Sequence, residues 1–220
     1  TASIFISLYV LMLTVTTQRR RLLYLIPALA ILAGTVGYFA FDVIKTRVDI
    51  WLNPWLDTSG NAWQLAQAQI AIATGGLTGT GPGLGSPQFV PVAVSDFIFT
   101  TIAEELGVLG TGAVLLLLLF LVIRGISIAL ASKTTFGRYL AFGISAYFAL
   151  QSILIVGGNL GLLPLTGVTL PFISYGGSSL VTNILSVLLL LRISTETSAK
   201  DLPEKVRVPY RWVTGIFTGI

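Results

Sequence analysis

The fold of this chain is decided by its longest apolar stretch, residues 97–123, which read FIFTTIAEELGVLGTGAVLLLLLFLVI. A run of roughly 18 or more mainly apolar residues is typical of a transmembrane helix. Helices are the expected form because a backbone that crosses lipid must satisfy its own hydrogen bonds. Four more apolar blocks occur along the chain, at residues 2–17, 22–44, 139–160 and 180–191. The sequence therefore predicts an all-α integral membrane protein, a polytopic helical bundle with about five transmembrane helices.

The composition argues against a water-soluble domain. Hydrophobic residues make up 54% of the chain and charged residues only 10%, whereas soluble domains carry about 25% charged residues. The absence of cysteine excludes disulfides and cysteine metal sites. The absence of histidine removes the most common general base. Acid–base chemistry must therefore come from the nine carboxylates, a tyrosine or a lysine.

Lysine and arginine residues set the predicted orientation of the helices. Three basic segments, at residues 19–21, 124–138 and 192–211, alternate along the chain and hold 11 of its 13 basic residues. Because basic segments favour the cytoplasmic side, only Lys45 and Arg47 are left on the outside. The net charge of +4 is thus a topology signal, and we expect no nucleic acid partner.

These signals divide the chain into four predicted regions. Residues 1–44 form two transmembrane helices joined by a cytoplasmic arginine-rich turn, and residues 45–96 form a large extracytoplasmic loop. Residues 97–196 form three transmembrane helices with an outer segment broken by proline and glycine, and residues 197–220 form a cytoplasmic tail and a truncated apolar segment. We expect the chain to be cut at both ends, because it begins without methionine and stops within an apolar stretch.

The predicted outer loop has three parts. It begins near Trp51 and Trp55, which suit a membrane–water interface. Residues 62–74 combine apolar residues with glutamines and predict an amphipathic helix on the outer leaflet. The glycine-rich run from Gly75 to Gly85 cannot form a regular helix and lacks the lysine of a phosphate-binding loop. We interpret it as a flexible outer loop beside a site.

Asp96 is the strongest single candidate for a catalytic residue. It stands where the outer loop meets the apolar stretch. One interpretation is a helix N-cap, since aspartate is preferred just before a helix and its charge suits the positive end of the helix dipole. The other is a general base at the mouth of a membrane cavity, because a carboxylate with suitable neighbours can accept a proton. Both interpretations can hold together.

Four more charged residues allow a functional and a structural interpretation. Glu104 and Glu105 lie inside the apolar stretch, where a carboxylate usually faces protein or water. If the helix begins near Asp96, Glu104 lies about 12 Å deeper in the membrane. We favour a buried network between helices for Glu105 and leave the role of Glu104 open. Lys45 and Arg47 could hold a lipid diphosphate or could extend to the interface from a helix end.

A second informative stretch is uncharged and spans residues 159–179, which read NLGLLPLTGVTLPFISYGGSS. It is apolar, yet Pro164, Pro171 and four glycines interrupt it. Irregular backbone at membrane depth occurs only where it is buried in protein or lines a cavity. The stretch is therefore a broken helix that faces a substrate or a tight packing turn, and the residues alone leave both open.

Four motifs, in this order along the chain, resemble those of the SEDS family, which includes FtsW, RodA and SpoVE. The motifs are Asn53-Pro54-Trp55-Leu56-Asp57, the glutamine-rich segment and glycine-rich loop at Gln64–Gly83, Ser95-Asp96-Phe97-Ile98-Phe99 with Glu104-Glu105-Leu106-Gly107, and the proline- and glycine-rich residues 163–179. The resemblance spans roughly residues 47–194. It implies a ten-helix fold to which this chain contributes the last five helices.

The resemblance also implies a function. SEDS proteins are peptidoglycan glycosyltransferases of the bacterial cytoplasmic membrane, which polymerise lipid II for cell division or cell shape. The essential aspartate of the family matches Asp96, which would deprotonate the acceptor sugar hydroxyl. Positive charge for the leaving diphosphate would come from Lys45, Arg47 or a divalent cation, Mg or Mn, whose identity is open. The expected partners are lipid II, membrane lipids and a class B penicillin-binding protein, which is a transpeptidase.

Further site residues are expected on the same motifs. The expected substrate-binding residues are Lys45, Arg47, Gln64, Gln67, Ser174, Tyr175, Gly176, Gly177 and Ser178, and the expected structural or auxiliary residues are Glu104, Glu105, Pro164 and Pro171. Family members often carry a glutamate and a histidine where this chain has Pro91-Val92-Ala93-Val94, so the roles of those side chains are not transferred. A lipid II flippase and a non-catalytic scaffold are the alternative functions. The outer position of Asp96 favours the enzyme.

Overall fold

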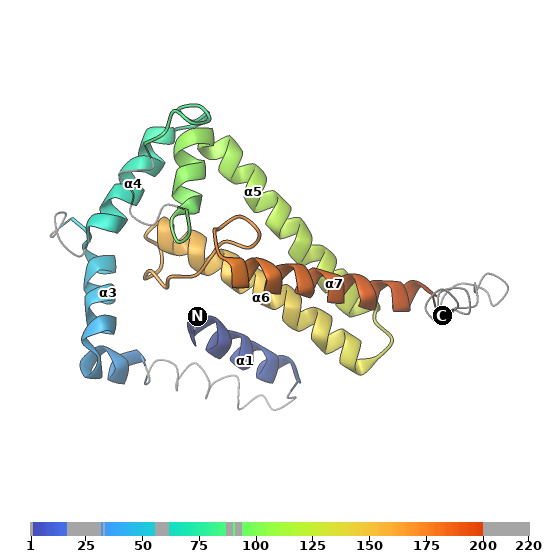
Figure 1. The fold of residues 1–220 in the computed structure, drawn as a ribbon. Coiled ribbons are helices and arrows are strands. Elements are labelled where there is room, and N and C mark those ends of the chain that lie inside the picture. The colour runs from blue at the N-terminus through green and yellow to red at the C-terminus, as the bar shows by residue number, and fades with distance from the viewer. Residues whose placement is uncertain are drawn as a thin grey trace, which may run out of the picture.

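The computed structural model describes residues 2–16, 32, 34–55, 62–86, 90 and 94–199. Within these residues the regular structure is helical and includes no strand. The helices are α1 (Ala2–Thr16), α3 (Asp42–Leu52), α4 (Trp63–Gly75), α5 (Ile98–Ala131), α6 (Thr135–Asn159) and α7 (Gly177–Ala199). Figure 1 shows α3 and α4 at one end of the long helices α5, α6 and α7. The predicted all-α fold class is confirmed.

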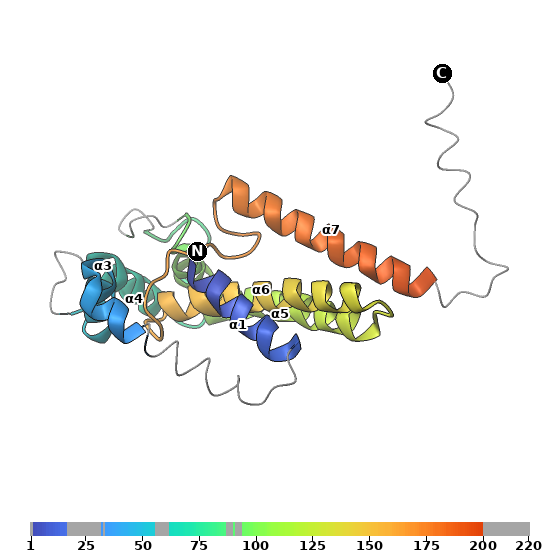
Figure 2. The same cartoon turned by 90° about the horizontal axis from the view of Figure 1, so that it is seen from below.

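Three of the described helices, α5, α6 and α7, are long and apolar enough to cross a membrane. They coincide with the last three predicted blocks. A short turn joins α5 to α6, and the Thr134 hydroxyl at the start of α6 accepts a hydrogen bond from the Gly137 N–H at 3.1 Å. Such a cap satisfies one of the free N–H groups of a helix start. Figure 2 shows α5 and α6 lying together, with α7 inclined away from them toward its start.

A cluster of buried apolar residues packs these three helices together. The buried cluster comprises Ala129 of α5, Ala141, Ile144 and Phe148 of α6, and Leu190 and Ile193 of α7. Ala141 is fully buried, which lets the helix backbones approach closely. Many leucines on the outer faces of α5 and α7 remain exposed, as a lipid-facing surface requires.

The first two predicted blocks are only partly described. The first forms α1, which packs against α6. Residues 22–31 and 33 of the second block, at residues 22–44, lie outside the described residues, whereas residues 34–40 are helical and α3 follows them. The arginine-rich turn at residues 19–21 and the tail from residue 200 onward also lie outside the described residues. These parts of the predicted organisation therefore remain predictions.

The helix predicted from the longest apolar stretch is broken at Gly107, where φ is 65° and ψ is −162°. Figure 1 shows that the chain rises along residues 98–106 and then turns back into the long part of α5. A straight helix of 34 residues would be about 51 Å long, well beyond the ~30 Å of a bilayer core. Residues 108–131 alone span about 36 Å. Glu104 and Glu105 therefore lie on the short arm before the break, and the depth predicted for Glu104 stays a prediction.

The glycine-rich residues 75–86 wrap around this break, and we call them the glycine clasp. The Thr80 and Gly81 N–H groups donate to the carbonyls of Glu104 and Glu105, at 2.9 and 3.0 Å. These carbonyls belong to the last turn of the short arm, where the helix has no N–H donors of its own for them. The clasp therefore ends the short arm in the way that a helix cap does.

The clasp also begins the long arm. The N–H groups of Val108 and Leu109 donate to the carbonyls of Gly76 and Leu77, at 3.0 and 3.2 Å. A free N–H buried in lipid or protein costs free energy comparable to a lost hydrogen bond. The glycine clasp thus supplies hydrogen-bond partners to both helix ends that the break creates.

Close backbone approach explains the glycines of the clasp. A Cβ at Gly75 would overlap the carbonyl oxygen of Ala103, and a Cβ at Gly79 would overlap that of Glu105. The interpretation of this run as a flexible loop is therefore wrong, since its glycines are needed for packing and for hydrogen bonds to α5.

The predicted helix at residues 62–74 is confirmed as α4. Its buried residues are Leu65, Ala66, Ala68, Ala71 and Gly75, and they form the side that packs against α5. Trp63 and Ile70 are exposed on α4. The helix thus joins the outer loop to the membrane helices and forms one wall of the site described next.

Candidate active site

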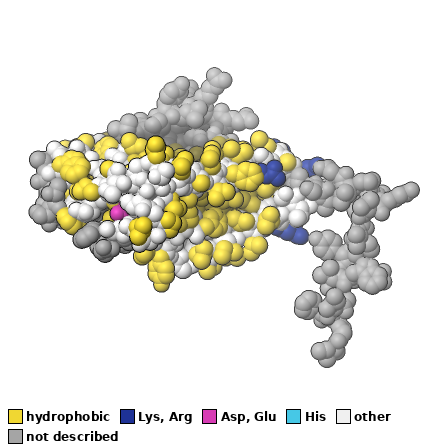
Figure 3. Space-filling model, turned by 90° about the horizontal axis from the view of Figure 1, so that it is seen from above, with side chains coloured by type: hydrophobic (Ala, Val, Ile, Leu, Met, Phe, Trp, Pro, Cys, Tyr) yellow, Lys and Arg dark blue, Asp and Glu magenta, His cyan; other side chains and the backbone are white. Residues whose placement is uncertain are grey.

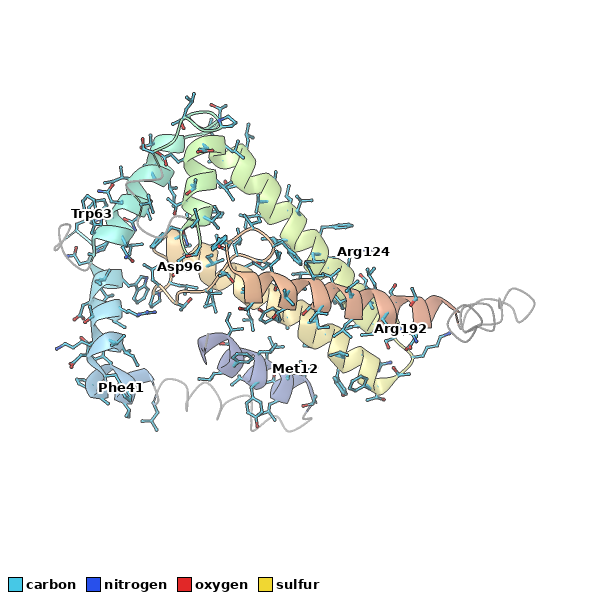
Figure 4. The ribbon with its side chains drawn as sticks, viewed as in Figure 1. Met12, Phe41, Trp63, Asp96, Arg124 and Arg192 are labelled. Atoms are coloured by element: carbon cyan, nitrogen blue, oxygen red, sulfur yellow. The ribbon has the colours of Figure 1, made fainter. Side chains whose placement is uncertain are left out.

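A cavity of about 660 Å³ opens between the outer-loop helices and the end of α6. Its polar lining residues are Asp42, Thr46, Arg47, Gln64, Asp96, Asn159 and Thr166. Trp51 of α3 and Trp63 of α4 add aromatic surface to it. Figure 4 shows Asp96 near the end of α6, far from Arg124 and Arg192 at the other end of the long helices. The cavity thus combines a carboxylate, a guanidinium and aromatic rings.

Asp96 does not cap a helix. The short arm of α5 begins at Ile98 with Phe97 as its N-cap, and no side chain makes a capping hydrogen bond there. The capping interpretation is therefore wrong, because the residue lies one position too early. Its Oδ1 accepts a hydrogen bond from the neighbouring Ser95 hydroxyl at 3.1 Å. The half-buried carboxylate lines the cavity, where it is available for chemistry.

The main chain around Asp96 is held at three successive carbonyls. The donors are the Tyr175 N–H to Val94 at 2.8 Å, the Ser174 hydroxyl to Ser95 at 2.6 Å, and the Asn159 amide to Asp96 at 2.9 Å. All three donors come from the end of α6 and the irregular segment that follows it. The broken stretch at residues 159–179 therefore packs directly against the residue with the candidate chemistry.

Arg47 and Gln64 are the predicted substrate-binding residues that the structure brings to the cavity of Asp96. One guanidinium nitrogen of Arg47 donates to the Leu165 carbonyl at 2.8 Å, which fixes α3 against the segment after α6. Trp51, one turn further along α3, donates to the Gly161 carbonyl at 2.9 Å. Arginine has five N–H donors, so Arg47 keeps donors for an anionic ligand.

Other predicted substrate-binding residues lie beside the cavity rather than in its lining. Lys45 is exposed on α3, and Gln67 is half-buried on α4. Ser174 is buried, and its hydroxyl accepts a hydrogen bond from the Leu170 N–H at 2.7 Å. Tyr175 is 80% exposed. The adjoining Gly176, Gly177 and Ser178 lie at the start of α7, also outside the lining.

The two prolines of the broken stretch lie in a packed turn. Pro164 is half-buried and Pro171 is buried. Phe172 follows with φ of 65°, a left-handed conformation that is costly for a bulky residue. Its ring contacts that of Phe148 in α6, with 5.5 Å between the centroids. The stretch therefore packs as a turn, and residues 165–168 also line the cavity, while its role toward a substrate stays a prediction.

Glu104 is bound to the glycine clasp. The side chain is only 6% exposed, and its Oε1 accepts a hydrogen bond from the Ser86 N–H at 3.0 Å. Oε2 has no hydrogen-bond partner among the described residues. Glu105 is half-buried, and its side chain lies against Gly85. Both glutamates therefore support the break in α5 and do not line the cavity of Asp96.

The described residues do not form a metal site by themselves. They contain no group of three or more aspartate, glutamate, histidine or cysteine side chains arranged to hold an ion. The carboxylates that line the cavity are Asp42 and Asp96. Residues 91–93, where the motif departs from the family pattern, lie outside the described residues.

Sequence reasoning missed Asn159 and Thr100 as parts of the site. Both are fully buried, and the Thr100 hydroxyl donates to the Asn159 Oδ1 at 2.7 Å. Polar side chains within otherwise apolar helices were the available signal. Their pairing could not be read from the sequence, because it joins two helices that are distant along the chain.

Comparison with known proteins shows what this chain resembles. Residues 1–199 match the model of the FtsW/RodA/SpoVE family, described as a cell cycle protein. The peptidoglycan glycosyltransferase RodA of Mycobacterium bovis is 46% identical over 163 residues, which are 74% of this chain and 35% of that protein. The probable peptidoglycan glycosyltransferase FtsW of Geobacter metallireducens is 42% identical over 156 residues, which are 70% of this chain and 42% of that protein.

A solved structure is also similar, and its description reads "Structural coordination of polymerization and crosslinking by a peptidoglycan synthase complex". The TM-score is 0.68 at 29% identity, over 86% of this chain and 53% of that one. The chain spans less than half the length of the curated relatives named above. The resemblance drawn from the four motifs is confirmed, and so is the polytopic helical fold.

Proposed function

Because the chain belongs to the FtsW/RodA/SpoVE family, we propose that it is the C-terminal part of a peptidoglycan glycosyltransferase. This enzyme polymerises lipid II into glycan strands at the outer face of the bacterial cytoplasmic membrane, for cell division or cell shape. The names of the relatives support this assignment, since both are called peptidoglycan glycosyltransferases.

A single observation carries the proposal for the site. The Asp96 carboxylate and the Arg47 guanidinium line one cavity at the end of the spanning helices. Glycosyl transfer from a lipid diphosphate needs a base for the acceptor and positive charge for the leaving group. This cavity offers both. The rings of Trp51 and Trp63 add flat aromatic surfaces, and Gln64 adds an amide, and both kinds of group suit sugars.

The reaction follows from these roles. Asp96 accepts the proton of the acceptor sugar hydroxyl as that oxygen attacks the anomeric carbon of the donor. The bond between the anomeric carbon and the diphosphate oxygen breaks, and the diphosphate leaves with the electron pair. Attack opposite the leaving group inverts the anomeric configuration. Arg47 stabilises the negative charge of the diphosphate through its remaining N–H donors.

The distribution of charge supports an outward-facing cavity. Figure 3 shows lysine and arginine side chains gathered at one end of the molecule, an acidic side chain at the other, and apolar surface between them. The described basic residues at the first end are Arg124, Lys133, Arg138 and Arg192. Basic residues favour the cytoplasmic side, so the cavity of Asp96 faces outward. Lipid II presents its sugars on that side.

A class B penicillin-binding protein is the proposed partner. The similar solved structure is described as a peptidoglycan synthase complex that coordinates polymerisation and crosslinking. The polymer made at the cavity of Asp96 would be crosslinked by this transpeptidase.

The experiment incubates purified full-length protein with lipid II, alone and with the transpeptidase. The proposal predicts glycan strands in at least the second mixture. Absence of polymer together with transfer of lipid II across a liposome bilayer would instead identify a flippase. Absence of both, with intact partner binding, would identify a scaffold, and either of these results contradicts the proposal.

A further inference from the structure

The three residues that lead into the short arm of α5 are fixed through their main chain. Successive carbonyls at Val94, Ser95 and Asp96 each accept a hydrogen bond from the segment at residues 159–175. Outside a helix or a strand, three consecutive carbonyls held by one distant segment leave little freedom in φ and ψ. The direction of the Asp96 side chain is therefore set by residues that are distant in sequence.

Ser174 is at the centre of this arrangement. Its hydroxyl donates to the Ser95 carbonyl at 2.6 Å and accepts from the Leu170 N–H at 2.7 Å. The residue is only 8% exposed, and it does not line the cavity. A hydroxyl has one hydrogen to donate, and that hydrogen is used within the protein. Ser174 is thus poorly placed to bind a sugar and well placed to hold the residue before Asp96.

Asn159 holds Asp96 from the other side. Its Nδ2 donates to the carbonyls of Asp96 and Ile155, at 2.9 and 2.8 Å, and its Oδ1 accepts from the Thr100 hydroxyl at 2.7 Å. Both hydrogens of the amide are therefore engaged, although the residue borders the cavity. The side chain is fully buried and joins the end of α6 to the short arm of α5.

We propose that Ser174 and Asn159 are positioning residues that hold the Asp96 carboxylate toward the cavity. The inference rests on the proposed function, in which Asp96 is the general base. A general base must lie within hydrogen-bonding distance of the proton that it accepts. Displacement of a reacting group by about 1 Å can cost about a hundredfold in rate. Among the described residues the carboxylate is hydrogen-bonded only to its neighbour Ser95, so its position depends on the main chain.

The test compares Ser174→Ala and Asn159→Leu in the full-length protein with its transpeptidase partner. Ser174→Ala loses a single oxygen, and Asn159→Leu keeps approximately the same side-chain volume. Both variants remove a hydrogen bond to the main chain around Asp96. Ser186→Ala is the matched control, because its hydroxyl bonds only to the Thr182 carbonyl within α7. The rate of lipid II polymerisation is measured against substrate concentration, per molecule that binds the partner.

We expect both variants to lower kcat by about tenfold to a hundredfold with little change in KM, because a misplaced base slows the chemical step. Ser174→Thr retains the hydroxyl and is expected to recover most of the rate. If Ser174→Ala does not fold, the Asn159→Leu measurement decides on its own.

Two results would overturn the inference. An increase in KM at unchanged kcat would make Ser174 a substrate-binding residue, as the sequence motif predicted. Unchanged kcat and KM in both variants would remove any positioning role. Failure of the proposed function is recognised separately, since the wild-type protein with its partner would then make no glycan strands. Failure of the base assignment alone would appear as polymerisation by Asp96→Asn at the wild-type rate.

Discussion

Asp96 and Arg47 reach the same cavity from two different elements, one from the residues before α5 and the other from α3. Arg47 also donates a hydrogen bond to the Leu165 carbonyl, so its guanidinium is oriented before any substrate binds. Prior orientation lowers the entropy lost on binding. In the proposed reaction Asp96 therefore accepts the proton and Arg47 binds the diphosphate.

Replacing Arg47 by glutamine should weaken substrate binding. A hydrogen bond to a charged group contributes about 1.5–3 kcal/mol, so KM for lipid II should rise by about tenfold or more. Arg124→Gln serves as the matched control, because Arg124 lies at the opposite end of the molecule (Figure 4). Equal kcat and KM values for Arg47→Gln and the wild type would remove Arg47 from the diphosphate site.

Replacing Thr100 by valine should destabilise the fold. The substitution keeps the shape of the side chain but leaves the buried Oδ1 of Asn159 without its donor. Such an unsatisfied group costs about 1–3 kcal/mol. The midpoint of thermal unfolding in detergent should fall for Thr100→Val. It should stay near the wild-type value for Thr182→Val, whose exposed hydroxyl bonds only within its own helix. Equal midpoints for both variants would contradict the assigned hydrogen bond.

At the scale of elements, the break in α5 and the glycine clasp determine where the short arm lies. The spans of α5, α6 and α7 could be predicted from hydropathy, because a long apolar run has few alternatives in a membrane protein. The position of the break could not be predicted, since a glycine such as Gly107 is also tolerated within a helix. What marks the break is backbone pairing between the clasp and α5, which depends on folding rather than on local composition.

The structure of the clasp leads to a prediction about two of its glycines, which have similar φ angles. Gly79 and Gly83 have φ of 79° and 75°, so alanine is strained at both positions. A Cβ at Gly79 would also overlap the Glu105 carbonyl, whereas a Cβ at Gly83 would meet nothing within 4 Å. Overpacking costs about 1–3 kcal/mol more, so Gly79→Ala should unfold at a clearly lower temperature than Gly83→Ala. The same unfolding temperature for both would show that the clasp is loose.

At the scale of the whole molecule, charge and hydropathy agree on one orientation. Basic side chains gather at one end and the cavity of Asp96 lies at the other (Figures 3 and 4). The sequence alone predicted this orientation from the alternation of basic segments. It could not predict which of the outer residues share a cavity, because Arg47, Gln64 and Asp96 meet only after α3, α4 and α5 have packed.

The orientation can be measured with single cysteines, because this chain contains none of its own. Leu84→Cys places a thiol on the clasp, where Leu84 is 74% exposed, and Lys133→Cys places one in the turn between α5 and α6. In a full-length protein whose other cysteines are replaced, a membrane-impermeant maleimide added to intact spheroplasts should label the first and spare the second. The reverse pattern would place the cavity of Asp96 in the cytoplasm and contradict the proposed function.

The central claim is that Asp96 is the base of the polymerase, and the most direct test is lipid II polymerisation by Asp96→Asn. The amide has the same shape as the carboxylate but cannot accept the proton in the same way. We expect Asp96→Asn to make glycan strands about a hundredfold more slowly, or slower still, with normal folding and partner binding. Glycan strands at the wild-type rate from Asp96→Asn would contradict it.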